Sequence, residues 1–521
     1  MTITRRQALL SGAAAAATLP LLGSNAYAAA DLDIAVIGGG ISGLYAALRL
    51  ATARPTQTLR LFEMGEQLGG RLHSYAFPQS PGLIGELGAA RFTQSHSHVT
   101  GLARTFDLAM RPSPLDLPQA RLFLRGRNIP LRHTGVEPLD YAITPTKQMI
   151  DGHRLRSALS EILGQTTPPT PDAWSTQRLT IRIQNKPLAA WQVSALLAAA
   201  LSPAERDYLR DTARLDDATL QGNALALCDR LFREADAEGP FFTLAGGFQK
   251  LPRAIAARLS GLGVNLSTGE RLVSLVVPQG KTGLFKLAFE SANGRRSQIS
   301  AKNVILALPR AGLDAIPDFA ARKSIALDSV TSVAAVKALL LYKSAWWSDL
   351  AIHGGRSLTD SAARQFNALG AEEQRLASEP SGGFGLLETL SESADAQTLR
   401  DLAGNVKSQS GFSLFTPESA LATSLHQQAS QTFGVPAPAP LAVAFQDWSA
   451  APFGGGLSAW ATGADPQSIS TAMLQPLKGR ALYITGDAWS TRQNTVEGAL
   501  EQTEAMLQRH FGLNTPPWGA T

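Results

Sequence analysis

Runs of apolar and polar residues near the start of the chain predict a strand, a helix and a second strand. The apolar run 34–37 has the length of a buried parallel strand. Residues 44–50 carry apolar side chains at helical spacing, and a second strand-like run follows at 59–62. Elements of these lengths, in this order, predict one βαβ unit.

The turn between the first strand and the helix carries glycines in the spacing G-x-G-x-x-G. In a dinucleotide-binding unit, Gly38 forms the tight turn, Gly40 lets a pyrophosphate approach the backbone, and Gly43 lets the helix pack against the strand. The N–H groups of Ile41 and Ser42 would then face the pyrophosphate at the positive end of the helix dipole.

Two features after the second strand indicate the kind of dinucleotide. Glu63 ends that strand twenty residues after Gly43, where an acid accepts hydrogen bonds from the ribose hydroxyl groups. Gly70 and Arg71 follow in a Gly-Gly-Arg turn, which favours FAD over NAD. Arg71 would lie beside the pyrophosphate and offset its charge.

The remaining pattern predicts an α/β plus α+β protein. Residues 173–235 are mostly helical, and a helix is expected from 496 to 511. Strands are predicted at 264–266, 272–277, 284–289, 303–308 and 481–485. We expect a Rossmann-like FAD-binding domain of the glutathione-reductase type, built from discontinuous segments, with a mixed-sheet substrate domain and a helical insertion. The predicted segments are 31–73, 239–322 and 445–515 for the FAD-binding domain, 74–145 and 323–444 for the substrate-binding domain, and 146–238 for the helical domain.

Composition is that of a globular protein with an ample core. The 521 residues are 44% hydrophobic and 17% charged, with a net charge of +5. The length predicts two or three domains. No Lys/Arg stripe is interleaved with aromatic residues, so nucleic acid is not an expected partner. Cys228 is the single cysteine, which excludes an intramolecular disulfide, and its helical surroundings predict a buried thiol.

Residues 1–28 have the pattern of a twin-arginine signal peptide. Arg5 and Arg6 precede an apolar stretch from 13 to 22, and Ala26-Tyr27-Ala28 is a small-residue cleavage signal. A Sec signal or a membrane anchor is the alternative, but the apolar stretch is short for a membrane span. We therefore expect no membrane span in the mature chain, and a periplasmic or secreted location.

From residue 86 onward the chain resembles the flavin-dependent amine oxidase superfamily, and within it the L-amino acid oxidases. The resemblance is carried by Glu-Leu-Gly-Ala-Ala-Arg-Phe at 86–92, Gly-Gly-Phe-Gln-Lys-Leu at 246–251, the strand 304–309, the segment 336–347, Gly-Gly-Arg-Ser at 354–357, Trp448, Gly-Asp at 486–487 and Glu-Gly-Ala at 497–499. These motifs are spread over the whole chain after the predicted signal.

The resemblance implies contacts to noncovalent FAD. Val273 would meet the adenine through its backbone, Asp487 would accept a hydrogen bond from the ribityl chain, and the helix beginning at Val496 would direct its N-terminus at the flavin. Leu457 stands where a cysteine links FAD covalently in monoamine oxidases. The predicted cofactor-binding residues are Gly38, Gly40, Ile41, Ser42, Gly43, Glu63, Gly70, Arg71, Gly88, Ala89, Ala90, Arg91, Val273, Trp448, Gly486, Asp487 and Val496.

Two residues are the candidates for catalysis. Arg91 would grip the substrate carboxylate with two parallel hydrogen bonds, and pure amine oxidases usually lack this arginine. By the resemblance, Lys337 would hold a water near the flavin. A structural salt bridge or a contact with FAD phosphate is the alternative for Arg91, and a charge on a half-exposed strand is the alternative for Lys337. No metal site is predicted.

The chain departs from the family at two substrate contacts. Asn494 and Thr495 replace a Gly-Trp pair whose tryptophan forms one wall of an aromatic cage, and Trp460 or Trp489 is the candidate substitute. The stretch 364–367 lacks the family's carboxylate-binding tyrosine and offers Phe366 instead. The predicted substrate-binding residues are Arg91, Phe366, Trp460 and Thr495.

The activity implied by the resemblance is oxidative deamination of L-amino acids to 2-oxo acids, ammonia and hydrogen peroxide. It would proceed by hydride transfer from the α-carbon to FAD and reoxidation by dioxygen. The alternatives are an amine or polyamine oxidase, a decarboxylating amino-acid 2-monooxygenase, a quinone-linked amino-acid dehydrogenase and a flavin carrier without activity. The expected partners are the small-molecule L-amino acid and dioxygen, and a homodimer is left open.

Overall fold

The computed structural model describes residues 30–516 apart from 145–150, 214, 234–238, 280–282, 321, 323–324, 371–382, 405–409 and 451–452. The predicted signal segment 1–28 lies outside the described residues. Within the described part, no helix combines the length and apolar character needed to cross a membrane.

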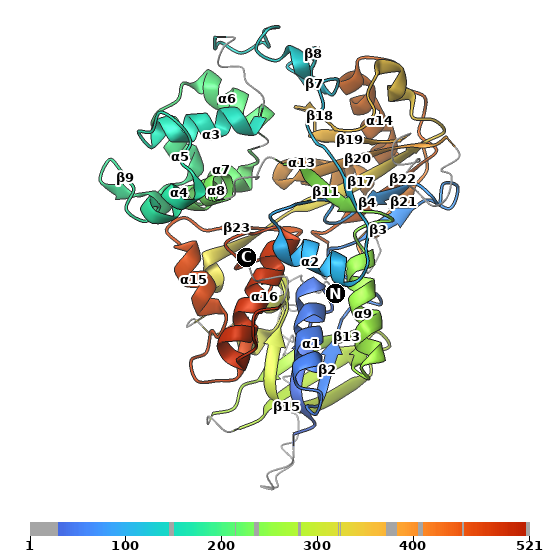
Figure 1. The fold of residues 1–521 in the computed structure, drawn as a ribbon. Coiled ribbons are helices and arrows are strands. Elements are labelled where there is room, and N and C mark those ends of the chain that lie inside the picture. Colours follow the sequence, from blue (N-terminus) through green and yellow to red (C-terminus); the bar gives the residue numbers. More distant parts are fainter. Residues whose placement is uncertain are drawn as a thin grey trace, which may run out of the picture.

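A seven-stranded sheet forms the lower body of the molecule (Figure 1). Its parallel part has the order β12-β2-β1-β15-β24, and the amino-terminal half of the long strand β15 pairs antiparallel with β14, followed by β13. These strands come from three separated stretches of the chain. The strands are β1 (Leu32–Ile37), β2 (Leu59–Phe62), β12 (Asn265–Ser267), β13 (Glu270–Val276), β14 (Phe285–Ser291), β15 (Arg296–Leu306) and β24 (Leu482–Ile484).

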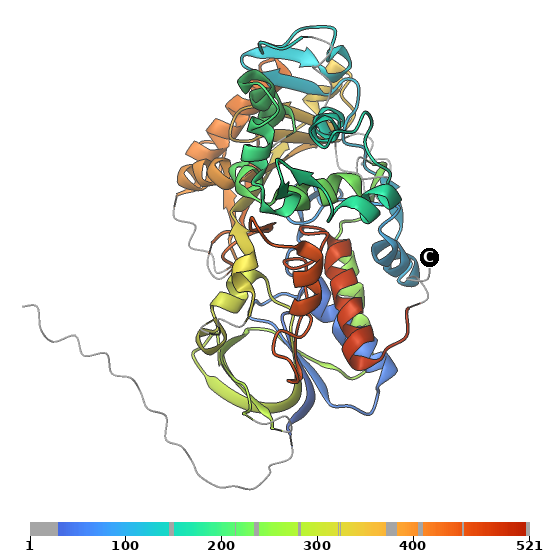
Figure 2. The same ribbon diagram turned by 90° about the vertical axis from the view of Figure 1, so that its left-hand side faces the viewer.

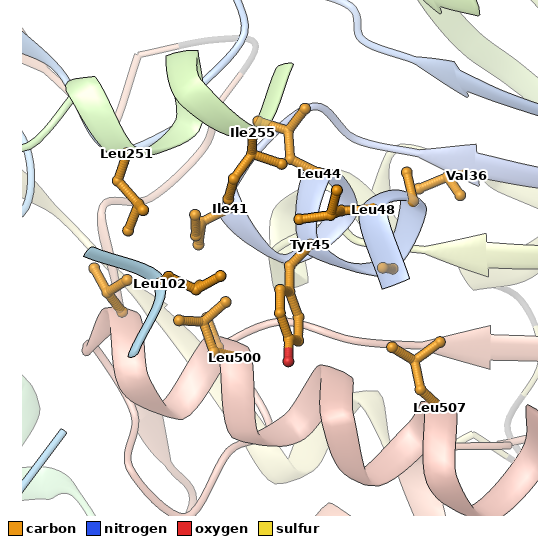
Figure 3. Close-up of a cluster of buried hydrophobic side chains, with 14 of the residues drawn as sticks. Val36, Ile41, Leu44, Tyr45, Leu48, Leu102, Leu251, Ile255, Leu500 and Leu507 are labelled. Atoms are coloured by element: carbon orange, nitrogen blue, oxygen red, sulfur yellow. The ribbon is translucent and has the colours of Figure 1, made fainter. Parts of the chain in front are cut away.

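Both faces of β1 are buried, which explains its continuous apolar run. Ile34 and Val36 join a core under four helices, whereas Ala35 and Ile37 face a second core on the other side of the sheet. Figure 3 shows the first core, with Tyr45 of α1 directed at the last helix. The four helices are α1 (Ile41–Ala53), α2 (Ser97–Thr105), α9 (Lys250–Gly261) and α16 (Val496–Phe511), and the second core is joined by α10 (Arg310–Asp314), α11 (Pro317–Ala320) and α15 (Pro466–Met473).

An eight-stranded mixed sheet forms the upper body, in the order β21-β22-β17-β20-β19-β18-β7-β8. Alternate residues of β17 face opposite sides. Val336, Leu340 and Tyr342 pack in a core with α13 (Ser393–Ala403) and α14 (Ala420–Phe433), whereas Leu339 and Leu341 pack in another with the hairpin of β3 (Ser74–Ala76) and β4 (Ile84–Glu86). The strands are β7 (Arg121–Leu124), β8 (Arg127–Pro130), β17 (Ala335–Tyr342), β18 (Arg356–Thr359), β19 (Gln365–Leu369), β20 (Gly385–Glu392), β21 (Phe412–Phe415) and β22 (Ala442–Asp447).

The helical insertion packs around a core of its own (Figures 1 and 2). Cys228 is fully buried in this core, as predicted, and burial raises the pKa of its thiol. Asn223 joins the insertion to the C-terminal part of the chain, because its side chain donates to the carbonyls of Ala461 and Ala464. The elements are α3 (Asp151–Ile162), α4 (Pro171–Gln177), β9 (Arg182–Ile183), β10 (Lys186–Pro187), α5 (Val193–Ala198), α6 (Pro203–Thr212), α7 (Asp217–Gln221) and α8 (Ala224–Phe232).

Two small sheets connect these bodies. One has the order β5-β11-β6, and the other pairs β16 with β23. The first contains β5 (Phe92–Thr93), β6 (Met110–Pro112) and β11 (Phe241–Leu244), the second β16 (Val330–Val333) and β23 (Leu457–Trp460). The predicted domain boundaries stay predictions, and both small sheets pair strands from a predicted FAD-binding segment with strands from a predicted substrate-binding segment.

Candidate functional site

The glycine-rich turn leaves its backbone exposed to an incoming group at one position only. A Cβ on Gly43 would lie 1.9 Å from the carbonyl oxygen of Gly38, and one on Gly38, where φ is 108°, would lie 2.4 Å from the carbonyl oxygen of Ala307. A Cβ on Gly40 would meet only the Cα of Gly70, at 3.9 Å. Gly40 is the N-cap of α1 and offers no side-chain cap. The free N–H groups of α1 beside this open face fit a pyrophosphate.

Glu63 lies beside the turn and is held by backbone donors. Its Oε2 accepts from the N–H of Gly39 at 2.6 Å and its Oε1 from that of Gly65 at 2.7 Å, while burial raises its pKa. The Glu63 carbonyl accepts from the N–H of Glu270, at the start of β13. The pairing of β13 with β14 shifts between Leu272 and Ser274, so Val273 is a bulge residue outside the regular ladder.

Arg71 and Asp487, predicted to touch different parts of FAD, contact each other. The Arg71 guanidinium binds the Asp487 carboxylate with both Nη atoms, one of them at 3.2 Å, and Nη1 also donates to the Gly456 carbonyl at 2.9 Å. These contacts bring together the Gly-Gly-Arg turn, the loop before β23 and the turn after β24, which are far apart in sequence.

The segment Gly88–Ala90 forms a wall next to Arg71. The N–H of Ala89 donates to the Arg71 carbonyl at 2.9 Å, and a Cβ on Gly88 would lie 2.0 Å from that same oxygen. Trp448 donates its indole N–H to the Leu87 carbonyl at 2.8 Å. Lys337 is 6% exposed and donates from Nζ to the Gly88 carbonyl at 3.1 Å. The structure thus assembles Arg71, Gly88, Lys337 and Trp448 at one place.

Arg91 follows this wall directly and is half-buried. Its Nε donates to the hydroxyl of Ser113 at 3.0 Å, which orients the guanidinium from the side of β6. Arg91 and Lys337 are therefore linked through the short segment 88–91. Sequence reasoning did not identify Ser113, because only the folded chain brings it to Arg91.

The start of α16 has a role that the sequence did not indicate. Thr495 is its N-cap and accepts from the N–H of Gly498 at 2.9 Å. Glu497 instead caps α2, because its carboxylate accepts from the N–H groups of His98 and Val99 at 2.9 and 3.0 Å. Burial would raise the pKa of Glu497, but these bonds and the one from the His98 ring lower it. His98, Glu497 and Glu501 bring possible metal-ligand atoms within 4.8 Å of one another, but hydrogen bonds and the Arg492–Glu501 ion pair already employ them.

The remaining predicted substrate residues lie in two places. Trp460 and Thr495 border a cavity of about 130 Å³ against α7 and α8, although Trp460 is only 3% exposed and belongs to a hydrophobic core. Phe366 is fully buried against Phe433 of α14, on the sheet face opposite Lys337. This position does not support a substrate contact by Phe366. Its neighbour Asn367 occupies the face that carries Lys337.

Two buried acids near Lys337 were missed by sequence reasoning. Glu86 accepts from the N–H of Phe248 at 2.7 Å and from the Ser74 hydroxyl at 2.8 Å. The Glu86 N–H donates to Glu388 Oε1 at 2.7 Å. Burial, together with the charge of Glu388, raises the pKa of Glu86 to about 8, although its hydrogen bonds and the charge of Lys337 lower it. Glu86 opens the motif 86–92, but no role was assigned to it, and Glu388 lies in none of the motifs.

Glu86→Gln should remove a pH dependence of stability. The pKa of Glu86 is raised in the folded state, so the protonated side chain stabilises the fold. This stabilisation is fully present below about pH 4.5 and is lost as the pH rises through about 8. The thermal stability of the unsubstituted protein should therefore fall relative to Glu86→Gln across this range, by on the order of a few kcal/mol. Melting curves against pH test this, with Glu205→Gln in the capping box of α6 as control. Parallel curves for Glu86→Gln and the parent would contradict it.

Comparisons with known proteins agree with this arrangement. A family model for flavin containing amine oxidoreductase matches residues 41–505. Aplysianin-A from Aplysia kurodai is 23% identical over 514 residues, which cover 92% of this chain and 90% of that protein. An L-amino acid oxidase from Cerastes cerastes is 25% identical over 345 residues, which cover 64% of this chain and 62% of that protein. A putrescine oxidase double mutant matches the fold with a TM-score of 0.67 at 14% identity, covering 92% of this chain and 99% of that one. Because the family model matches well over half of the chain, the chain belongs to the flavin-containing amine oxidoreductase family.

Proposed function

We propose that this protein is an FAD-dependent L-amino acid oxidase. The observation that carries the proposal is the position of Arg91, a half-buried cation joined to the Lys337 wall by the segment 88–91. A planar guanidinium recognises a carboxylate through two parallel hydrogen bonds. An enzyme that acts on amines alone has no carboxylate for such a group to bind.

The protein's own residues position the substrate. The Ser113 hydroxyl accepts from Nε and orients the Arg91 guanidinium, whose planar fork would bind the α-carboxylate. Holding the carboxylate fixes the α-carbon, and a fixed geometry lowers the entropic part of the barrier. Lys337, buried beside Gly88, would hold a water on the same side. The bound flavin supplies the redox chemistry, accepting two electrons and returning them to dioxygen.

We further propose that the flavin is FAD, bound without a covalent bond. The open face at Gly40 and the uncapped start of α1 support a pyrophosphate there, Glu63 supports a ribose and the bulge at Val273 supports an adenine. Leu457 has no nucleophile for a covalent link. Trp448, Asp487 and the start of α16 at Val496 would complete the contacts. Release of the flavin by acid precipitation, identified by chromatography, tests both points.

The location proposed is the periplasm or the exterior, reached by twin-arginine export. The Arg5-Arg6 pattern and the cleavage signal before Ala29 support it. Replacement of both arginines with lysine should retain the protein inside the cell, and fractionation measures this. Export that persists in this variant would contradict the proposal.

A peroxide assay on the purified yellow protein tests the activity. L-amino acids, their D-enantiomers and the matching decarboxylated amines are supplied in turn. Turnover of L-amino acids alone supports the proposal, whereas turnover of amines alone indicates an amine oxidase. An amide product indicates a decarboxylating monooxygenase, and flavin reduction without peroxide indicates a dehydrogenase with another acceptor.

Lys337→Met should separate the two half-reactions. Methionine retains the length of the side chain but removes the ammonium, so flavin should stay bound and its reduction by substrate should change little. Reoxidation by dioxygen should slow on the order of tenfold or more, a barrier increase of about 1.4 kcal/mol per factor of ten. Stopped-flow absorbance resolves the two steps. Unchanged reoxidation would remove Lys337 from the reaction.

A further inference from the structure

The small cavity bordered by Trp460 and Thr495 lies where the helical insertion meets the C-terminal part of the chain. Figure 1 shows α7 and α8 of the insertion above β23, and these elements supply opposite walls together with the turn 491–495. Its volume is about 130 Å³, and one water molecule takes about 30 Å³ in the liquid. The space therefore holds about four waters or one small ion.

Most of the charged side chains that line this cavity are cations. In chain order, the charged residues among the described lining are Asp229, Arg230, Arg233 and Arg492. The one acid does not balance the cations, because its carboxylate is already bound. Both oxygens of Asp229 accept from Arg178, and one of them also accepts from the indole N–H of Trp174 at 2.8 Å.

Arg233 is the cation that lacks a counter-charge. It is half-buried, directly after the end of α8, and its Nη2 donates to the neutral Gln467 Oε1 at 3.2 Å. The acids whose charges act on Arg233 are ion-paired with other arginines, Asp229 with Arg178 and Glu501 with another lining residue. A cation that is partly removed from water without an ionic partner is costly.

The electrostatics around Arg233 agree with this lack. Burial lowers the pKa of Arg233, although the charge of Asp229 raises it. The positive charges of Arg178 and Arg492 lower the pKa further. Because arginine stays protonated in proteins, loss of a proton does not relieve this crowding of cations. An anion in the cavity would relieve it.

The donors in the cavity indicate which kind of anion fits. A guanidinium presents a planar fork that matches two oxygens of a carboxylate or a phosphate group. The hydroxyl groups of Thr219 and Thr491 line the same cavity, and a hydroxyl can donate to a further oxygen. A small oxyanion therefore fits both the charge and the donors of this cavity.

The wall opposite the helical insertion continues into the candidate flavin site. Asn494 accepts from the Ser458 N–H at 2.8 Å and donates to the Ser458 carbonyl at 2.9 Å. Ser458 lies two residues after Gly456, whose carbonyl accepts from Arg71. Thr495, next to Asn494, is the N-cap of α16. A ligand in the cavity would therefore contact segments that also hold Arg71 and the start of α16.

We propose that this cavity binds a small oxyanion, a carboxylate or a phosphate group, between Arg233 of the insertion and Arg492 of the turn before α16. The anion supplies the counter-charge that the described residues lack. It also joins the helical insertion to the segments beside the flavin. The site is separate from Arg91, which is not among the residues that line the cavity.

Calorimetric titration of the flavin-loaded protein tests this site. Inorganic phosphate and acetate are supplied as separate probes, with chloride keeping the ionic strength constant. The parent should bind one of them at a single site, and Arg233→Gln should weaken that binding on the order of tenfold or more, because a hydrogen bond to a charged group is lost. Tighter phosphate assigns the inorganic ion, and tighter acetate assigns a small carboxylate. Binding of neither probe would overturn the proposal.

Three further variants show where the probe binds. Arg182→Gln is the matched control, because Arg182 is an exposed arginine in β9 of the same insertion and does not line the cavity. Its affinity for the probe should equal that of the parent. Arg233→Lys keeps the charge without the planar fork and should recover part of the affinity. Arg91→Ala should bind like the parent, and loss of binding there but not in Arg233→Gln would overturn the proposal.

Thermal melting distinguishes an anion site from an arginine with a purely structural role. A saturating probe should raise the melting temperature of the parent by on the order of a few degrees and leave that of Arg233→Gln unchanged. In chloride alone the two proteins should melt at similar temperatures, because Arg233 has a neutral partner. Equal gains in both proteins would overturn the proposal.

These measurements do not depend on the proposed function. Neither of them uses turnover, so a protein that oxidises no L-amino acid would still bind the anion. Conversely, failure to bind either probe would leave the proposed oxidase activity unaffected. The absorbance of the bound flavin gives one further readout. It should shift as the cavity fills, and an unchanged spectrum with bound anion would overturn the link between the cavity and the flavin site.

Discussion

Arg91→Ala is expected to raise the apparent KM for L-amino acids on the order of a hundredfold while the protein keeps its flavin. Loss of a charged bidentate pair at a desolvated site commonly costs about 3 kcal/mol. Arg91 donates from Nε to the Ser113 hydroxyl and lies outside the glycine-rich turn, so its replacement by alanine should leave that turn unchanged. Initial rates across substrate concentrations and the flavin absorbance per protein measure the two effects.

Two further variants sharpen this test. Arg91→Lys retains the charge but loses the planar fork, so it should recover only part of the affinity. Ser113→Ala retains the guanidinium but removes the hydroxyl that accepts from its Nε. The apparent KM should therefore rise less in this variant than in Arg91→Ala. Kinetics of Arg91→Ala equal to those of the parent would show that Arg91 does not bind the carboxylate.

Gly43→Ala is expected to yield a protein that lacks flavin and melts at a lower temperature. The added Cβ would lie 1.9 Å from the Gly38 carbonyl oxygen. Because this oxygen belongs to the backbone, it cannot move aside unless the turn opens. In a helix without such a contact, a change from glycine to alanine stabilises the helix by about 1 kcal/mol. A loss of stability in Gly43→Ala would therefore report the close contact with Gly38. The absorbance ratio of flavin to protein and the melting temperature report the result.

Gly261→Ala is the matched control. Gly261 is also helical, at the end of α9, and a Cβ there would meet nothing within 4 Å. That variant should retain flavin and be at least as stable as the parent. A yellow, fully stable Gly43→Ala protein would contradict the role given to the turn.

The parts of the fold that could be predicted are those encoded in neighbouring residues. The strand β1 and the helix α1 follow from local apolar spacing, and the glycines between them follow from the G-x-G-x-x-G spacing, in which Gly43 packs on Gly38 five residues earlier. The strand before α16 and that helix were likewise evident as an apolar run followed by a helical pattern. Cys228 was correctly expected in a buried helix because its neighbours are apolar.

The site could be predicted only as a set of residues, without its contacts. Gly88, Trp448 and Lys337 were named from their motifs, and the structure brings them together. The pairing of Arg71 with Asp487 and the capping of α2 by Glu497 join segments about four hundred residues apart. Such contacts leave no periodic pattern in the sequence.

The sequence by itself determined the βαβ unit, the glycine turn and the candidates Arg91 and Lys337, because local spacing and residue chemistry carry that information. Only the tertiary structure decided that Phe366 faces the helices while Asn367 faces Lys337, and that Glu388 meets Glu86. In a strand buried on both faces, such as β19, no alternation of apolar and polar residues marks which side chains face which side. A shift of one residue exchanges the two faces, and the pairing with neighbouring strands is what sets that register.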